Sequence, residues 1–214
     1  MTAGTRYARY IAAFALIVLA GIVINRTLAP SAGARGVAPG VQIPPFAAPL
    51  ALGGLQGDVN VATHPNDGQA GTHPACTVRG AQILNICELY ERSPVVLALF
   101  VDGSTCPAVL SDMQALTSSF PNVRFAAVAI KGEAAGVGNL IRSRGLRFPV
   151  GLDRDGALVP LYQLATCPQI TFVYPGGVVQ SEALLSRPPH AQLRARIEEL
   201  IAASRARGWK PGSA

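Results

Sequence analysis

Residues 94–101, PVVLALFV, form an unbroken apolar run that is rich in β-branched side chains. A strand with no polar face must be covered on both sides, so this run predicts a central, doubly covered strand. The run 122–130, NVRFAAVAI, has the same character. Between the two runs, apolar residues recur at spacings of three and four, as on one face of a helix. They are Val109, Leu110, Met113, Leu116 and Phe120.

The remaining elements follow in an order that favours an α/β domain. We expect a short helix over 135–145, an extended segment over 147–153, a bent helical turn over 157–165, paired strands over 169–174 and 178–185, and an amphipathic helix over 188–208. Strand, helix, strand, helix, hairpin and helix in this sequence predict a central mixed β-sheet with helices on both faces.

The only long uncharged apolar stretch is 10–25, YIAAFALIVLAGIVIN, with two arginines before it and Arg26 after it. As a helix it would span about 24 Å, slightly less than a bilayer core of about 30 Å. We interpret residues 1–29 as a signal anchor or transmembrane helix whose amino end lies in the cytoplasm. The alternative is a signal peptide cleaved at AGA, residues 32–34. Either interpretation places the rest of the chain on the extracytoplasmic side, secreted if the signal is cleaved.

Composition sets the remaining boundaries. Residues 30–75 are rich in alanine, glycine and proline, which predicts a linker and an extended entry segment that packs on the domain from Pro44. We expect the domain to span 76–208 and a short tail to span 209–214.

The net charge of +6 is uneven along the chain. Residues 1–35 carry +4 and residues 187–214 carry +4, whereas residues 36–186 carry −2. The folded part is therefore nearly neutral, and we expect no nucleic-acid partner.

Four cysteines occur at positions 76, 87, 106 and 167, and none lies in a CxxC or in a zinc-binding spacing. Cysteines in an exported chain favour disulfides or redox chemistry. Cys106 lies between a predicted strand and a predicted helix, where the helix N-terminus favours a thiolate. Asp102, four residues earlier, would oppose that effect if it lay close. A dithiol enzyme would carry its second cysteine three residues on, at Val109.

Three stretches resemble the TlpA/ResA-like branch of the thioredoxin superfamily, with features of peroxiredoxin-like (AhpC/TSA) redoxins. PPFAAPLALGGLQGDVNVA resembles the entry segment, SPVVLALFVDGSTCP the first core strand and active-site loop, and LRFPVGLDRDGALVPLYQLATCPQITFVYPGGVV the path through a cis-proline into the hairpin. The likeness covers about residues 43–203. It implies a thioredoxin-like fold with Pro168 as the cis-proline.

The active site departs from both families. The usual family motif is Trp-Cys-x-x-Cys; here the tryptophan is missing and Val109 occupies the position of the second cysteine. Peroxiredoxins carry a threonine three residues before the cysteine, and here that position is Gly103. In the thioredoxin fold the cis-proline loop packs against the first turn of the active-site helix. The resemblance therefore implies that Cys106 and Cys167 are neighbours in space, although they are 61 residues apart.

The predicted function follows from that neighbourhood. We expect Cys106 to attack the disulfides of protein substrates, Cys167 to resolve the mixed disulfide, and Pro168 to complete the catalytic set. Two alternatives remain: a thiol peroxidase that uses Cys106 alone, and a non-catalytic thioredoxin-like binding module whose cysteines form structural bridges.

Cys76 and Cys87 suggest a separate disulfide. If residues 80–83 form a hairpin turn, the two cysteines oppose each other on paired strands, with Cβ atoms about 4.5–5.5 Å apart. We expect a structural bridge; the alternative is a second redox pair that relays electrons to Cys106. The three histidines do not form a convincing copper site, so we expect no metal and no cofactor.

Overall fold

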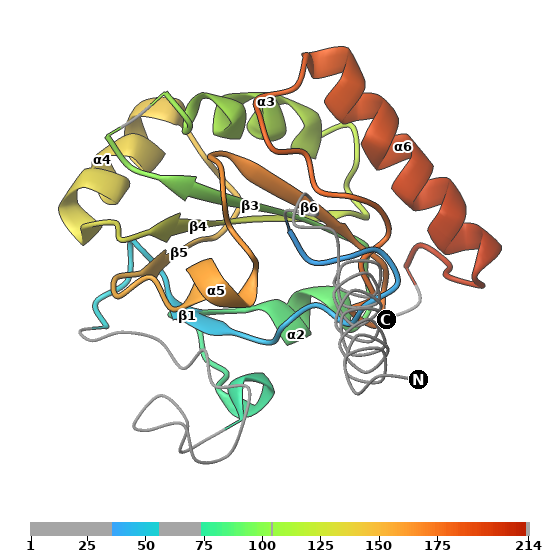
Figure 1. The fold of residues 1–214 in the computed structure, drawn as a ribbon, viewed down its shortest axis with the longest axis horizontal. Helices are drawn as coiled ribbons and strands as arrows, with labels where there is room; N and C mark the ends of the chain where they lie inside the picture. Colours follow the sequence, from blue (N-terminus) through green and yellow to red (C-terminus); the bar gives the residue numbers. More distant parts are fainter. Residues whose placement is uncertain (1–35, 56–73, 104, 213–214) are drawn as a thin grey trace, which may run out of the picture. The chain divides into compact units, whose positions relative to one another are not determined.

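The computed structural model describes residues 36–55, 74–103 and 105–212 (Figure 1). The chain divides into two units, Met1–Ala34 and Arg35–Ala214, and the described residues belong to the second. The predicted signal anchor lies outside the described residues. Within the described ranges, none of the helices has the length and apolar character needed to cross a bilayer.

Four strands form the central sheet in the order β5-β4-β3-β6. They are β3 (Val95–Val101), β4 (Arg124–Ile130), β5 (Val150–Asp153) and β6 (Gln169–Val173). β3, β4 and β5 run parallel, whereas β6 is antiparallel to β3. The prediction of a mixed sheet built around the 94–101 run is confirmed, because that run becomes β3 and is paired on both edges.

Three helices cover one face of the sheet (Figure 1). They are α3 (Ala108–Thr117), α4 (Ala134–Arg144) and α6 (His190–Ala206). The apolar positions that predicted the helix after β3 are all buried here, against alternate side chains of the strands. α4 ends at Gly145, whose φ of 59° is the left-handed conformation that favours glycine at a helix C-terminus.

The other face is covered by a two-stranded ribbon and short helices. The ribbon pairs β1 (Ala47–Pro49) with β2 (Ile83–Asn85), and the helices are α2 (Ile86–Tyr90), α5 (Leu158–Leu161) and the 3₁₀ helix η2 (Ala75–Thr77). The segment from Pro44 thus contributes one strand, β1, to this ribbon. Gly151 permits the close packing, since a Cβ there would lie 2.7 Å from the Cβ of Ala48.

The prediction of a regular return strand over 178–185 is wrong. Val179 bridges Val173, and Leu184 bridges Ile170, but no continuous strand joins these two points. The step from 170 to 173 covers three positions on β6, whereas the step from 179 to 184 covers five. The two extra residues bulge out of the pairing and interrupt the ladder.

Tyr162 ties α5 to the entry segment and makes stability sensitive to alkaline pH. Its buried hydroxyl group donates a hydrogen bond to the Pro44 carbonyl at 2.7 Å, and burial raises the pKa of this phenol well above its usual value. Above about pH 10 the unfolded chain releases the tyrosine proton and the folded chain retains it, so the free energy of unfolding falls as pH rises.

We therefore expect Tyr162→Phe to lower the free energy of unfolding by about 1 kcal/mol at pH 7, because the hydrogen bond is lost. Above pH 10 the variant should lose stability less steeply than the natural protein, by up to about 1.4 kcal/mol per pH unit. Urea unfolding at pH 7, 9 and 10.5 measures both effects. Equal steepness in the two proteins would show that Tyr162 does not carry the alkaline sensitivity.

Candidate functional site

Cys106 lies two residues before α3, in the turn that leads into the helix. β3 ends at Val101, and α3 begins at Ala108 with Pro107 as its N-cap residue. The Cys106 carbonyl accepts a hydrogen bond from the N–H of Val109 at 3.4 Å, which joins the cysteine to the helix. Val109 itself is fully buried in the core. The position that holds a second cysteine in a CxxC therefore serves here as a core contact.

Cys167 approaches Cys106 from a different segment, the loop before β6. It precedes Pro168 and the first residue of β6, and the Cys167–Pro168 peptide bond is cis. A disulfide joins Cys106 to Cys167, with Cα atoms 5.5 Å apart. The backbone N–H of Val101 donates a hydrogen bond to the Cys167 sulfur at 3.2 Å. The end of β3, the start of α3 and the start of β6 thus meet at one pair of sulfur atoms.

The disulfide opens into a pocket of about 450 Å³. Both cysteines are half-buried and line this pocket. The other lining residues are Thr105, Ala108, Arg144, Pro168, Ser186 and Arg187. A pocket of this size gives an external thiol a path to the bond.

Asp102 directs its carboxylate toward α4. One oxygen accepts a hydrogen bond from the N–H of Gly103 at 2.8 Å. The other lies where a Cβ on Gly136 would be only 2.6 Å away, in the first turn of α4. The unpaired N–H groups and dipole at that helix start favour a negative charge. The absence of a side chain at Gly136 is what leaves room for this arrangement.

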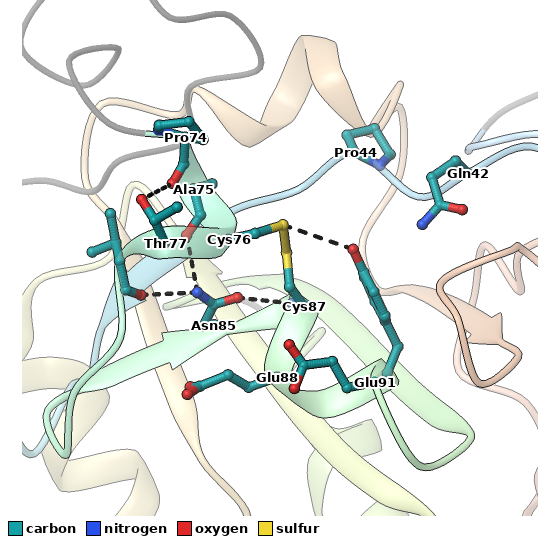
Figure 2. The surroundings of a disulfide bond; sticks show 12 residues. Gln42, Pro44, Pro74, Ala75, Cys76, Thr77, Asn85, Cys87, Glu88 and Glu91 are labelled. Carbon is teal, nitrogen blue, oxygen red and sulfur yellow. Dashed lines mark hydrogen bonds between the residues drawn. A yellow bond between two sulfur atoms is a disulfide. The ribbon is translucent and has the colours of Figure 1, made fainter.

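Cys76 and Cys87 form the second disulfide, with Cα atoms 5.4 Å apart (Figure 2). The predicted cross-strand geometry is wrong, because Cys76 lies on η2 and Cys87 on α2. β2 pairs with β1 and not with a strand that carries Cys76. The turn through 80–83 therefore leads from η2 into the ribbon instead of closing a hairpin between the cysteines.

Asn85 organises the backbone around this disulfide (Figure 2). Its side-chain oxygen accepts a hydrogen bond from the Cys87 N–H at 2.8 Å and caps α2. Its side-chain nitrogen donates to the carbonyls of Ala75 and Val78 at 2.9 and 2.8 Å. One buried amide thus holds both cysteine-bearing segments, while the Tyr90 hydroxyl group lies 3.9 Å from the Cys76 sulfur.

We expect Cys76→Ala/Cys87→Ala to lower the free energy of unfolding by roughly 3 kcal/mol, because the loop released in the unfolded chain spans 11 residues. The rate at which the Cys106–Cys167 bond exchanges with dithiothreitol should change by less than about twofold, since exchange depends on access to that bond. Urea unfolding and stopped-flow exchange measure the two effects. A large loss of exchange rate with retained stability would indicate the electron relay instead.

Two pocket residues were not predicted from the sequence. Arg144 lies in the last turn of α4 and Arg187 lies before α6, far from either cysteine in the chain. Neither belongs to a motif, and only the packing of α3 against α4 and the 185–189 segment brings them to the disulfide. The hydrogen bond from the Val101 N–H was also not predicted, because a backbone group is not marked by residue type.

No family model matches the chain, and no curated protein sequence is significantly similar to it. Solved structures do match. A Chlorobium tepidum protein provisionally named thiol:disulfide interchange protein DsbE aligns with a TM-score of 0.57 at 16% identity, over 78% of this chain and 98% of its own. The thioredoxin domain of a Bacteroides vulgatus thiol-disulfide oxidoreductase aligns with a TM-score of 0.57 at 12% identity, over 77% of this chain and 99% of its own.

A third structure, from Bacteroides thetaiotaomicron and provisionally named protein disulfide isomerase, aligns with a TM-score of 0.57 at 14% identity. It covers 83% of this chain and 99% of its own. The fold is thioredoxin-like. In this thioredoxin-like fold one disulfide joins the turn before α3 to the cis-proline loop, and the chain has no CxxC.

Proposed function

We propose that this thioredoxin-like protein is a thiol–disulfide oxidoreductase that acts on protein thiols and disulfides through Cys106 and Cys167. The observation that carries the proposal is the disulfide between these two residues in a solvent-reachable pocket at the start of α3. The names of the matching structures, which include an interchange protein, an oxidoreductase and an isomerase, support the same class of activity.

The geometry supports attack at the Cys106 sulfur. A substrate thiolate forms a bond to that sulfur, the Cys106–Cys167 bond breaks, and Cys167 leaves as a thiolate. The Val101 N–H that contacts the Cys167 sulfur favours this departure, because a hydrogen bond to a thiolate stabilises its charge. The mixed disulfide then involves Cys106.

A second substrate thiol completes the reaction. It attacks the substrate sulfur of the mixed disulfide, forms the substrate disulfide and releases Cys106 as a thiolate. Two electrons and two protons pass in total from the substrate dithiol to the cysteine pair. In the reverse direction Cys106 attacks a substrate disulfide and Cys167 resolves the mixed disulfide, because the N-terminus of α3, which follows Cys106, favours a thiolate there.

The site of action in this proposal is extracytoplasmic. It rests on the apolar 10–25 stretch of residues 1–29, which would anchor the domain to the membrane or export it. An alkaline-phosphatase reporter fused to the C-terminus is active only after export, so an active fusion is expected in a bacterial host. An inactive fusion would contradict this location.

Transfer of electrons from a dithiol peptide tests the proposed activity. The disulfide form of the full chain is mixed with an excess of a reduced two-cysteine peptide, quenched with acid and analysed by mass spectrometry. We expect one oxidised peptide for each protein molecule, with the two new protein thiols at Cys106 and Cys167. Unchanged peptide and protein would instead support the non-catalytic binding module.

A further inference from the structure

Two arginines line the pocket on the side of α4 and the 185–189 segment. Arg144 is half-buried, whereas Arg187 has 56% of its side chain exposed. Among the described residues that line the pocket, none carries a carboxylate. An incoming substrate therefore meets two positive charges beside the Cys106–Cys167 bond.

α3, the helix that follows Cys106, also positions these arginines. The Ser111 hydroxyl group accepts a hydrogen bond from Nη1 of Arg144 at 2.9 Å. The Asp112 carboxylate accepts hydrogen bonds from Nε and Nη2 of Arg187 at 2.7 and 3.1 Å. Ser111 and Asp112 follow Cys106 by five and six residues. Their contacts hold both guanidinium groups in a defined relation to the reacting sulfur.

The charges of the cluster do not cancel. Asp112 offsets one of the two arginines, so the group retains a net charge of +1. The Asp112 carboxylate engages the Nε and Nη2 edge of Arg187, and Nη1 lies outside that pair. Guanidinium groups bind carboxylates through parallel hydrogen bonds, so an arginine held in place beside a reactive bond is suited to select a carboxylate-bearing partner.

We propose that the site prefers thiols and disulfides that carry a carboxylate beside the reacting sulfur, and that Arg144 and Arg187 determine this specificity. The inference rests on the proposed exchange activity and names its substrate class. The chemistry of the step is unchanged: the substrate thiolate bonds to Cys106, Cys167 leaves as a thiolate, and the arginines hold the substrate carboxylate.

The test compares two single-cysteine peptides of equal length, one with aspartates and one with lysines on both sides of the cysteine. Stopped-flow measurements give the second-order rate at which each thiol opens the Cys106–Cys167 bond. Each rate is divided by the rate at which the same peptide reduces uncharged dipyridyl disulfide, because flanking charges also alter the thiol pKa. We expect the normalised rate to favour the acidic peptide by about tenfold at low salt and by much less in 0.5 M salt.

Three variants that each remove one positive charge separate a local effect from a global one. Arg144→Gln and Arg187→Gln should each reduce the preference by about threefold. Arg142→Gln should leave the preference unchanged. Arg142 lies two residues from Arg144 on α4, and its guanidinium group donates a hydrogen bond to the Asn139 side chain at 2.7 Å. A preference that is absent in the natural protein, or that all three variants reduce equally, would overturn the proposal.

Two further measurements distinguish peptide carboxylates from small acidic thiols, and separate a failure of specificity from a failure of exchange. Mercaptoacetate compared with 2-mercaptoethanol, normalised in the same way, shows whether a small acidic thiol is favoured as strongly as the peptide. Dithiothreitol carries no carboxylate, so its rate on each variant measures how fast a thiolate alone opens the bond, and the peptide rates of that variant are compared with it. If dithiothreitol opens the bond and no charge preference is found, only the specificity is wrong. If dithiothreitol leaves the native bond intact, the exchange activity itself fails and the specificity fails with it.

Discussion

Replacing Cys106 with serine is expected to lower the rate of exchange with a dithiol peptide by a thousandfold or more. A hydroxyl group at this position cannot form the mixed disulfide, so removal of the sulfur that bonds to the substrate removes the reaction path itself. Cys167 remains in the variant, beside the Val101 N–H. Quenched-flow alkylation followed by mass spectrometry measures the rate and locates any remaining adduct.

Cys167→Ser is the matched control for this prediction. It removes the resolving sulfur and leaves Cys106 able to form a mixed disulfide. When the variant is treated with the disulfide-linked dimer of a single-cysteine peptide, an adduct of one peptide on Cys106 should accumulate. Adducts that form at Cys167 in the Cys106→Ser variant, at a rate close to that of the natural protein, would contradict the assigned order of attack.

Peroxide consumption that persists in Cys167→Ser and disappears in Cys106→Ser would favour the peroxidase.

Replacing Asp153 with alanine should lower the free energy of unfolding by about 3–5 kcal/mol. The Asp153 carboxylate is buried at the end of β5 and accepts hydrogen bonds from three consecutive N–H groups, those of Gly156, Ala157 and Leu158, at 3.1, 3.0 and 2.9 Å. Alanine would leave the N–H groups of the buried residues Gly156 and Leu158 without this acceptor, whereas the Ala157 N–H keeps its hydrogen bond to Asp155. Urea unfolding at pH 7 measures the loss.

Asp155→Ala is the control from the same turn. The Asp155 carboxylate is exposed and accepts a hydrogen bond from the Ala157 N–H at 2.9 Å. Water can replace this exposed acceptor, so we expect a loss of less than about 1 kcal/mol. Equal effects at Asp153 and Asp155 would show that burial of the carboxylate is not what stabilises the turn into α5.

The core of the fold was predictable because its strands and helices carry strong patterns. The uninterrupted apolar run at 94–101 favours a strand that is covered on both faces, and this strand is paired on both edges. The return strand was not predictable. Its apolar residues are those of an ordinary strand, and the two-residue bulge opposite β6 depends on pairing that the local sequence does not specify.

The site was predictable only in part, and the physical reason differs from residue to residue. The resemblance to thioredoxin-like proteins placed Cys106 and Cys167 in neighbouring loops, which periodicity alone could not have done. The disulfide between Cys76 and Cys87 was expected from their spacing, but its geometry depends on the buried amide of Asn85. Arg144 and Arg187 reach the pocket through packing between elements, and no local pattern encodes such contacts.

Stepwise reduction of the native protein tests the central claim most directly, because the two disulfides serve as controls for each other. The folded chain is treated with dilute dithiothreitol, alkylated and digested, and the labelled cysteines are identified by mass spectrometry. We predict that Cys106 and Cys167 are labelled first, while Cys76 and Cys87 remain bonded until the chain unfolds. Persistence of the Cys106–Cys167 bond until denaturation would contradict a redox role for this pair.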